Sequence, residues 1–161
     1  MIIMGIDPGD TLIGFGVLSK NSAGLSLVDH GCLKTGPGNA PEKLASLETQ
    51  LEAVLARHKP DIVGIEELFF FKNAKTVIRV AQARGAIMAL CVRKNIRVLE
   101  FTPLQIKQAV TGYGRAEKKQ VQRMLERIFQ LKKPLKQDDA ADALAAAWCA
   151  AQSYAMLDAL R

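Results

Sequence analysis

Two short stretches, IIMGID at residues 2–7 and DIVGIE at residues 61–66, repeat one pattern in distant parts of the chain. Each contains apolar residues that lead to Gly-Ile and then to an acidic residue, Asp7 in the first and Glu66 in the second. Short continuous apolar runs are typical of strands that are covered on both faces of a sheet. If the two strands are parallel neighbours, the two carboxylates lie side by side. Like charges at that distance raise each other's proton affinity unless a cation lies between them.

The residues around these two stretches predict an α/β fold. Apolar runs at 13–18 and 25–33, separated by turn residues, predict two more strands in an antiparallel meander. Asn39 and Glu42 have the spacing of a capping box, and the leucines that follow predict an amphipathic helix that Pro60 stops. A strand, a helix and the strand at 62–65 together imply a right-handed parallel crossover.

The second half of the chain predicts four helices and one strand. A helix over 74–94 is apolar on more than one side, with one stripe and a second group around it: Val77, Val80, Ala81, Ile87, Met88 and Cys91; Ala83, Ala86 and Leu90. A second apolar face indicates contact with another subunit, although alanines are also simply good helix formers. A strand at 96–101 precedes the capping box TPLQ, which starts the next helix at Pro103. The two remaining helices lie around residue 121, with a basic outer side, and from about Asp138.

The composition is that of one globular domain. With 161 residues and 49% hydrophobic residues, the chain supports a single core, so we expect one domain over residues 1–161. The apolar runs are shorter than the roughly 20 residues that a membrane span needs, and no charged leader precedes an apolar segment, so we expect a cytoplasmic protein. Cys32, Cys91 and Cys149 have no paired spacing, and we expect buried thiols.

The charge is distributed unevenly along the chain. Residues 72–136 carry 16 lysines and arginines against three glutamates, a net charge of +13, whereas the segments before and after carry −4 and −3. A basic segment of this size inside one domain indicates a polyanionic partner, although solvated helix faces also carry scattered lysines. Three of the six phenylalanines are adjacent at 69–71, and three neighbours cannot all face one core.

Two further carboxylates, Asp139 and Asp142, are spaced to share one face of the last helix. Together with Asp7 and Glu66 they form a set of four, which the neighbouring Asp138 could extend to five. Because only two histidines are present, an all-oxygen site for Mg²⁺ or Mn²⁺ is favoured over a zinc site. Helix capping by Asp138 or Asp139, and an Asp-Pro-Gly turn at Asp7, are the alternatives, but neither explains Glu66.

Five motifs in order resemble those of the RuvC family of bacterial Holliday-junction resolvases: GIDPG, IEELFFFKNAK, AQARG, GYGRAEKKQV and DAADALA. The resemblance extends from residue 1 to about residue 151. It implies an RNase H-like fold of the retroviral integrase superfamily, with a five-stranded mixed sheet flanked by helices. It also implies a homodimer that takes two Mg²⁺ per site, with Mn²⁺ as a substitute, and nicks two strands of like polarity in four-way junction DNA, leaving 5′-phosphates. The branch-migration proteins RuvA and RuvB are implied as partners.

The same resemblance implies roles for particular residues. The metal-binding catalytic carboxylates are Asp7, Glu66, Asp139 and Asp142, and the alignment of the Asp-Ala-Ala-Asp motif favours Asp139 over Asp138. Lys107 and Lys118 match catalytic lysines near the scissile phosphate, and Phe69 matches a residue that stacks on bases at the crossover. With the basic segment, this gives the predicted DNA contacts: Phe69, Lys72, Lys75, Arg79, Lys107, Arg115, Lys118, Lys119 and Arg123.

Two other classes of protein fit parts of the sequence. The stretch GIDPGDTLIGFGVL also resembles a phosphate loop of the actin and sugar-kinase superfamily, but that architecture needs two such domains and a second glycine-rich loop. A noncatalytic DNA-binding protein would use the acidic residues only as caps and turns.

Overall fold

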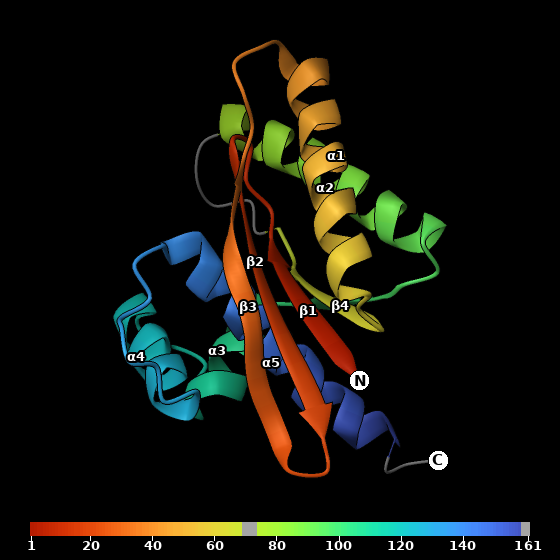
Figure 1. Ribbon diagram of the computed structural model, residues 1–161. Helices are drawn as coiled ribbons and strands as arrows, with labels where there is room; N and C mark the ends of the chain where they lie inside the picture. The colour runs from red at the N-terminus through yellow and green to blue at the C-terminus, as the bar shows by residue number, and fades with distance from the viewer. Residues whose placement is uncertain (69–73, 159–161) are drawn as a thin grey trace.

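The structure, a computed structural model, describes residues 1–68 and 74–158, although side chains are not described at 74–76 and 155–158. A single mixed sheet forms its centre, with the strand order β3-β2-β1-β4-β5 (Figure 1). The strands are β1 (Ile2–Asp7), β2 (Leu12–Asn21), β3 (Gly24–Lys34), β4 (Ile62–Glu66) and β5 (Arg97–Phe101). β1 pairs antiparallel with β2 and parallel with β4, and β4 pairs parallel with β5. The predicted five-stranded mixed sheet is confirmed.

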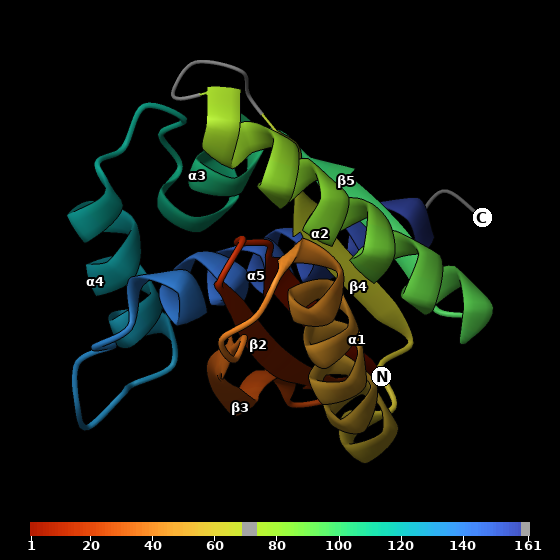
Figure 2. The same cartoon turned by 90° about the horizontal axis from the view of Figure 1, so that it is seen from above.

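Helices cover both faces of this sheet (Figures 1 and 2). They are α1 (Ala40–His58), α2 (Ala74–Arg93), α3 (Pro103–Thr111), α4 (Lys118–Ile128) and α5 (Asp138–Asp158). α1 and α2 pack on one face in one core cluster, whereas α5 lies on the other face with α3 and α4 packed against it. None of the described helices is long and apolar enough to cross a membrane.

Both predicted capping boxes are present. The Asn39 side chain accepts a hydrogen bond from the backbone N–H of Glu42, and the Glu42 carboxylate accepts one from the backbone N–H of Asn39. Thr102 and Gln105 make the same reciprocal pair at the start of α3, where Pro103 occupies the first helical position. Two donors are satisfied at each helix start, which explains why these boundaries could be read from the sequence.

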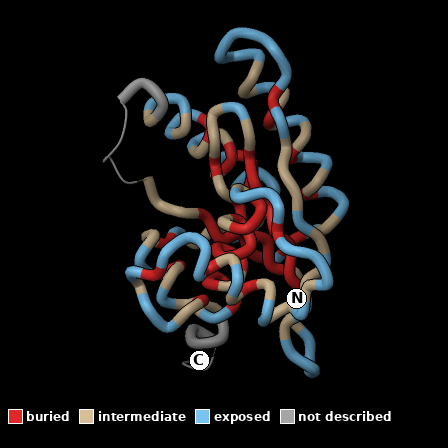
Figure 3. Tube along the Cα trace, turned by 90° about the vertical axis from the view of Figure 1, so that its left-hand side faces the viewer, coloured by how far each residue is buried: buried red, intermediate tan, exposed pale blue. Residues whose placement is uncertain are grey.

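α5 lies unusually close to the sheet because glycines face it. A Cβ atom added to Gly5 would lie 1.9 Å from the backbone oxygen of Ala143, and one added to Gly14 would lie 1.9 Å from the backbone oxygen of Asp139. Gly64 on β4 faces α5 in the same way, with the oxygen of Ala146 at 2.7 Å from an added Cβ. The buried residues accordingly concentrate in the sheet and in α5 (Figure 3).

Two predictions about burial need correction. The packed residues of α2 come from both predicted groups, since Ala83, Ile87, Leu90 and Cys91 are buried whereas Ala81 is exposed. Helical spacing shows which residues share a face, but the rotation of the helix about its own axis in the folded chain decides which face meets the sheet. Cys32 is half-buried on the edge strand β3, while Cys91 and Cys149 are buried as predicted.

Candidate active site

Asp7 and Glu66 end two neighbouring parallel strands. The register pairs Gly5 with Gly64 and Ile6 with Ile65, so the two acidic residues follow at the same level. Side chains alternate between the faces of a sheet, which places Asp7 on the side of Gly5 and Glu66 on the side of Gly64. Both carboxylates therefore face α5.

α5 brings the other two carboxylates to the same place. Asp7 is paired across the sheet with Gly14, and Gly14 lies against the backbone of Asp139 in the first turn of α5. Asp142 follows one turn later and lines the same cavity as Glu66. The close contact between glycine and helix thus determines the distance between the carboxylates on the strands and those on the helix.

The ionisation of this cluster shows how strongly its members interact. Burial, followed by the charges of Asp142, Glu66 and Asp139, raises the pKa of Asp7 to about 7, against the opposing charge of Lys118. Burial and then the charge of Asp142 raise the pKa of Glu66, against the opposing charges of Lys107 and Lys118. Like charges in a partly desolvated position favour protonation unless a cation is present, so the set is electrostatically suited to one.

The side chains do not converge on a single point. Among the residues that the structure describes, no three Asp, Glu, His or Cys side chains are close enough together to hold one ion. Positive charge comes instead from Lys118, whose Nζ lies 2.8 Å from Oδ2 of Asp142 and 3.4 Å from Oδ2 of Asp138. The carboxylates are therefore near enough to shift one another's pKa but are not at the distances at which ligands coordinate one metal ion, because charges interact over longer distances than coordination bonds. The donor set itself, four carboxylates and no histidine, fits a hard divalent cation.

A cavity of about 240 Å³ opens beside these groups. Its lining includes the acidic residues Glu66 and Asp142, the basic residues Lys107 and Lys118, and apolar residues such as Ile106 and Ala145. Two carboxylates and two ammonium groups therefore share one hollow at the end of the sheet. This is an arrangement that can hold a phosphate group next to cations.

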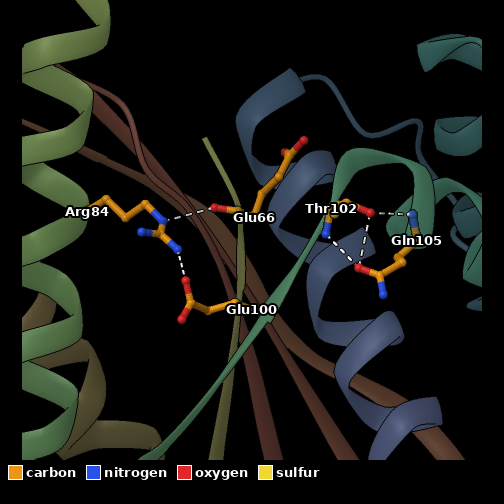
Figure 4. Close-up of polar contacts among 5 residues, drawn as sticks. All are labelled: Glu66, Arg84, Glu100, Thr102 and Gln105. Atoms are coloured by element: carbon orange, nitrogen blue, oxygen red, sulfur yellow. Dashed lines mark hydrogen bonds and ion pairs between the residues drawn. The ribbon is translucent and has the colours of Figure 1, made fainter. Parts of the chain in front are cut away.

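Arg84 is a site residue whose role the sequence analysis did not identify, although it belongs to the motif AQARG. Its Nε donates a hydrogen bond to the backbone oxygen of Glu66 at 3.2 Å, and its guanidinium forms an ion pair with Glu100 (Figure 4). The Glu66 carboxylate points away from Arg84 in the same view. Arg84 therefore fixes the end of β4 from the face opposite to the carboxylate cluster.

The predicted DNA contacts are only partly described. Phe69 and Lys72 lie outside the described residues, and Lys75 belongs to α2 without a described side chain. Arg79 forms an ion pair with Asp10, with 3.6 Å between Nη1 and Oδ2.

The remaining predicted contacts lie around α4, where Arg115, Lys119 and Arg123 are exposed. Arg123 lines a hollow of about 350 Å³ together with Tyr113 and Arg127. An exposed aromatic ring beside two guanidinium groups is compatible with a nucleic-acid partner.

Comparison with known proteins agrees with this geometry. The family model described as crossover junction endodeoxyribonuclease RuvC matches residues 3–150. Proteins of that name from Petrotoga mobilis and Caldicellulosiruptor saccharolyticus are 48% and 44% identical to this chain; the alignments cover 92% of this chain in both cases and 92% and 91% of those proteins.

Solved structures give the same result. A structure of Thermus thermophilus RuvC superposes with a TM-score of 0.88 at 33% identity, covering 97% of this chain and 96% of that one. T. thermophilus RuvC in complex with Holliday junction substrate superposes with a TM-score of 0.86 at 31% identity, with the same coverage. These likenesses confirm the expected RNase H-like fold. The chain belongs to the RuvC family of crossover junction endodeoxyribonucleases.

Proposed function

We propose that this protein is a structure-selective endonuclease that resolves four-way DNA junctions during homologous recombination and repair. It nicks two strands of like polarity and leaves 5′-phosphates. The observation that carries the proposal is a cluster of four carboxylates at one end of the sheet whose charges act on one another, with two lysines beside it: Asp7, Glu66, Asp139 and Asp142; Lys107 and Lys118. Membership of the endodeoxyribonuclease family supports it.

The cofactor in this proposal is a pair of Mg²⁺ ions, for which Mn²⁺ can substitute. Asp7 and Glu66 at the ends of β1 and β4, together with Asp139 and Asp142 on α5, would hold these ions. When bound, two such ions activate water at neutral pH and stabilise the attacking and leaving oxygens of an in-line displacement. Support comes from the raised pKa of Asp7, about 7, because a group held so unfavourably as an anion gains most from a cation.

The chain's own residues position the phosphate and balance its charge. Lys107 and Lys118 line the same cavity as Glu66 and Asp142, so their ammonium groups would offset the negative charge that develops on the reacting phosphate. Arg84 keeps the end of β4 in place through the Glu66 carbonyl.

Basic and aromatic residues around the site would bind the junction. Phe69 would stack on an unpaired base near the crossover, and Lys72, Lys75 and Arg79 would contact phosphates nearby. Along α4, Lys119 and Arg123 are exposed one helical turn apart, next to Arg115 in the preceding loop, and would follow the backbone of one arm. Binding should therefore weaken steeply with salt.

A homodimer would supply two sites for two strands. α2 supports this assembly because its exposed side carries apolar residues, with Ile78 62% and Val92 67% exposed, and Gly85 between them faces open space. Within each subunit, residues 1–161 would form one domain.

The proposal also includes the RuvA and RuvB proteins as partners and a cytoplasmic location, both of which follow from membership of the family.

Replacement of Asp7 by Asn tests the function. We expect Mg²⁺-dependent nicking of a synthetic four-way junction to disappear, while binding of the same junction in Ca²⁺ or EDTA persists. A noncatalytic DNA-binding protein would show no Mg²⁺-dependent nicking even as the wild type. Cleavage that is unchanged per bound complex in the Asp7→Asn variant would exclude this carboxylate from the site.

A further inference from the structure

Asp138 lies next to the four proposed ligands without being one of them. It is the first residue of α5, so it belongs to the helix and does not precede it as a cap. Asp138 and Asp142 are four residues apart and share one helix face. A single ammonium group, that of Lys118 at the start of α4, lies within 4 Å of both carboxylates, at 3.4 Å from Asp138 and 2.8 Å from Asp142.

We propose that Asp138 is a positioning residue for Lys118. It would keep the Lys118 ammonium beside the reacting phosphate when Asp142 turns to a cation. The inference rests on the proposed nuclease function and deepens it, since it assigns a task to a carboxylate that the family motif does not include.

In the loaded site, Lys118 and a divalent cation would compete for Asp142. Its Oδ2 accepts the shorter contact from Lys118, and a divalent cation at Asp142 would repel the same ammonium and compete for the same oxygen. Lys118 must then weaken its contact with Asp142 when the site is loaded. A lysine without a second partner would be free to leave the cavity.

Asp138 is placed to prevent that loss. Its side chain is 63% exposed against 33% for Asp142, so Asp138 lies at the outer rim while Asp142 lies deeper. The Lys118 side chain, 51% exposed, reaches the rim without leaving the cavity that it lines with Glu66 and Lys107. A move of the ammonium towards Asp138 therefore exchanges one carboxylate for another and keeps the charge beside the phosphate position.

A double-mutant cycle in single-turnover junction cleavage tests the proposal. Asp138→Asn should slow Mg²⁺-dependent cleavage about two- to fivefold, the effect of one exposed ion pair, with unchanged junction affinity in Ca²⁺. Asp138→Glu should restore the rate because a longer carboxylate still reaches the mobile ammonium. In a Lys118→Met background, Asp138→Asn should have no further effect. An equal slowing in both backgrounds, or a glutamate variant as slow as the asparagine variant, overturns the proposal.

Calorimetric binding of Mn²⁺ to the free protein gives a second readout that does not depend on cleavage. Lys118→Met should bind Mn²⁺ about fivefold more tightly, because the cation no longer competes with an ammonium about 4 Å away. Asp138→Asn should weaken Mn²⁺ binding more when Lys118 is present than when it is Met. A wild-type protein that neither binds Mn²⁺ nor cleaves junctions refutes the nuclease function itself. A wild type that does both, with no coupling between positions 118 and 138, refutes only the positioning role.

Discussion

Replacement of Asp7 by Asn should stabilise the metal-free protein at neutral and alkaline pH. In the fold the pKa of Asp7 is raised from 3.8 to about 7, first by burial and then by neighbouring carboxylates. Between these two values the folded protein binds more protons than the unfolded chain, so the free energy of unfolding falls as the pH rises. The contribution of protonated Asp7 to the free energy of unfolding is fully present below pH 3.8 and is lost as the pH rises through about 7.

The size of the effect follows from the shift. A change in the pKa of Asp7 from 3.8 to about 7 corresponds to about 4 kcal/mol. Integrated over the range used in the assay, about 2–3 kcal/mol of it is lost between pH 5 and pH 8. Asparagine resembles the protonated carboxyl at every pH. The difference between variant and wild type should therefore grow by that amount over the same range.

Urea unfolding followed by circular dichroism in EDTA, at pH 5 and pH 8, measures this difference. Glu52→Gln is the matched control, because it also removes one carboxylate. Lys94 lowers the pKa of Glu52 through a side-chain hydrogen bond, so the control should gain no stability at pH 8. Added Mg²⁺ should stabilise the wild type more than the Asp7→Asn variant. The reasoning is refuted if the difference between variant and wild type is the same at both pH values, or if wild type is the more stable protein at pH 8 in EDTA.

Four other substitutions test separate parts of the structure. Gly14→Ala should cost about 1–3 kcal/mol and cleavage activity, because its Cβ would overlap the backbone of α5, whereas Gly36→Ala, with nothing within 4 Å, should be neutral in urea unfolding. Arg84→Met should cost about 1–3 kcal/mol in the same assay and slow cleavage, since it removes the donor to the end of β4. Phe69→Ala should slow junction cleavage about 5- to 150-fold, equivalent to about 1–3 kcal/mol of stacking, with an unchanged unfolding curve; an unaltered rate rejects the stacking role. Ile78→Glu should shift the protein from dimer to monomer in sedimentation, and an unchanged mass would remove α2 from the interface.

The paired carboxylates could be predicted from the sequence because both depend on a local rule. A short apolar run predicts a buried strand, and parallel strands that end in acidic residues bring those residues to one edge, as Asp7 and Glu66 confirm. The register of α5 on the sheet could not be derived in this way. The glycines that face the alanines of α5, Gly5 and Gly64 among them, are what allows the close contact. Their role can be recognised only once the position of the helix is known.

Contacts between side chains that are distant in sequence were the other part that could not be predicted. No pattern links Lys118 to Asp138, because their contact depends on how α4 and α5 meet after the intervening loop. The packed face of α2 and the hydrogen bond from Arg84 to the Glu66 carbonyl depend in the same way on how α2 is placed against the sheet. Periodicity describes one element at a time, whereas these features belong to pairs of elements.

The packing of α5 and the electrostatics of the site have opposite effects on stability. Ala143 to Ala147 are almost completely buried against the sheet, and this close packing stabilises the fold. The same contact holds Asp139 and Asp142 beside Asp7, where the pKa of about 7 records a cost to the folded state. A larger residue at Gly14 would separate the charges but would also remove the packing. The unfavourable cluster therefore persists because the fold cannot relax it locally, and Lys118 offsets only part of the charge. A divalent cation would relieve the remainder, which is why cation affinity and folding stability should change together in variants of this site.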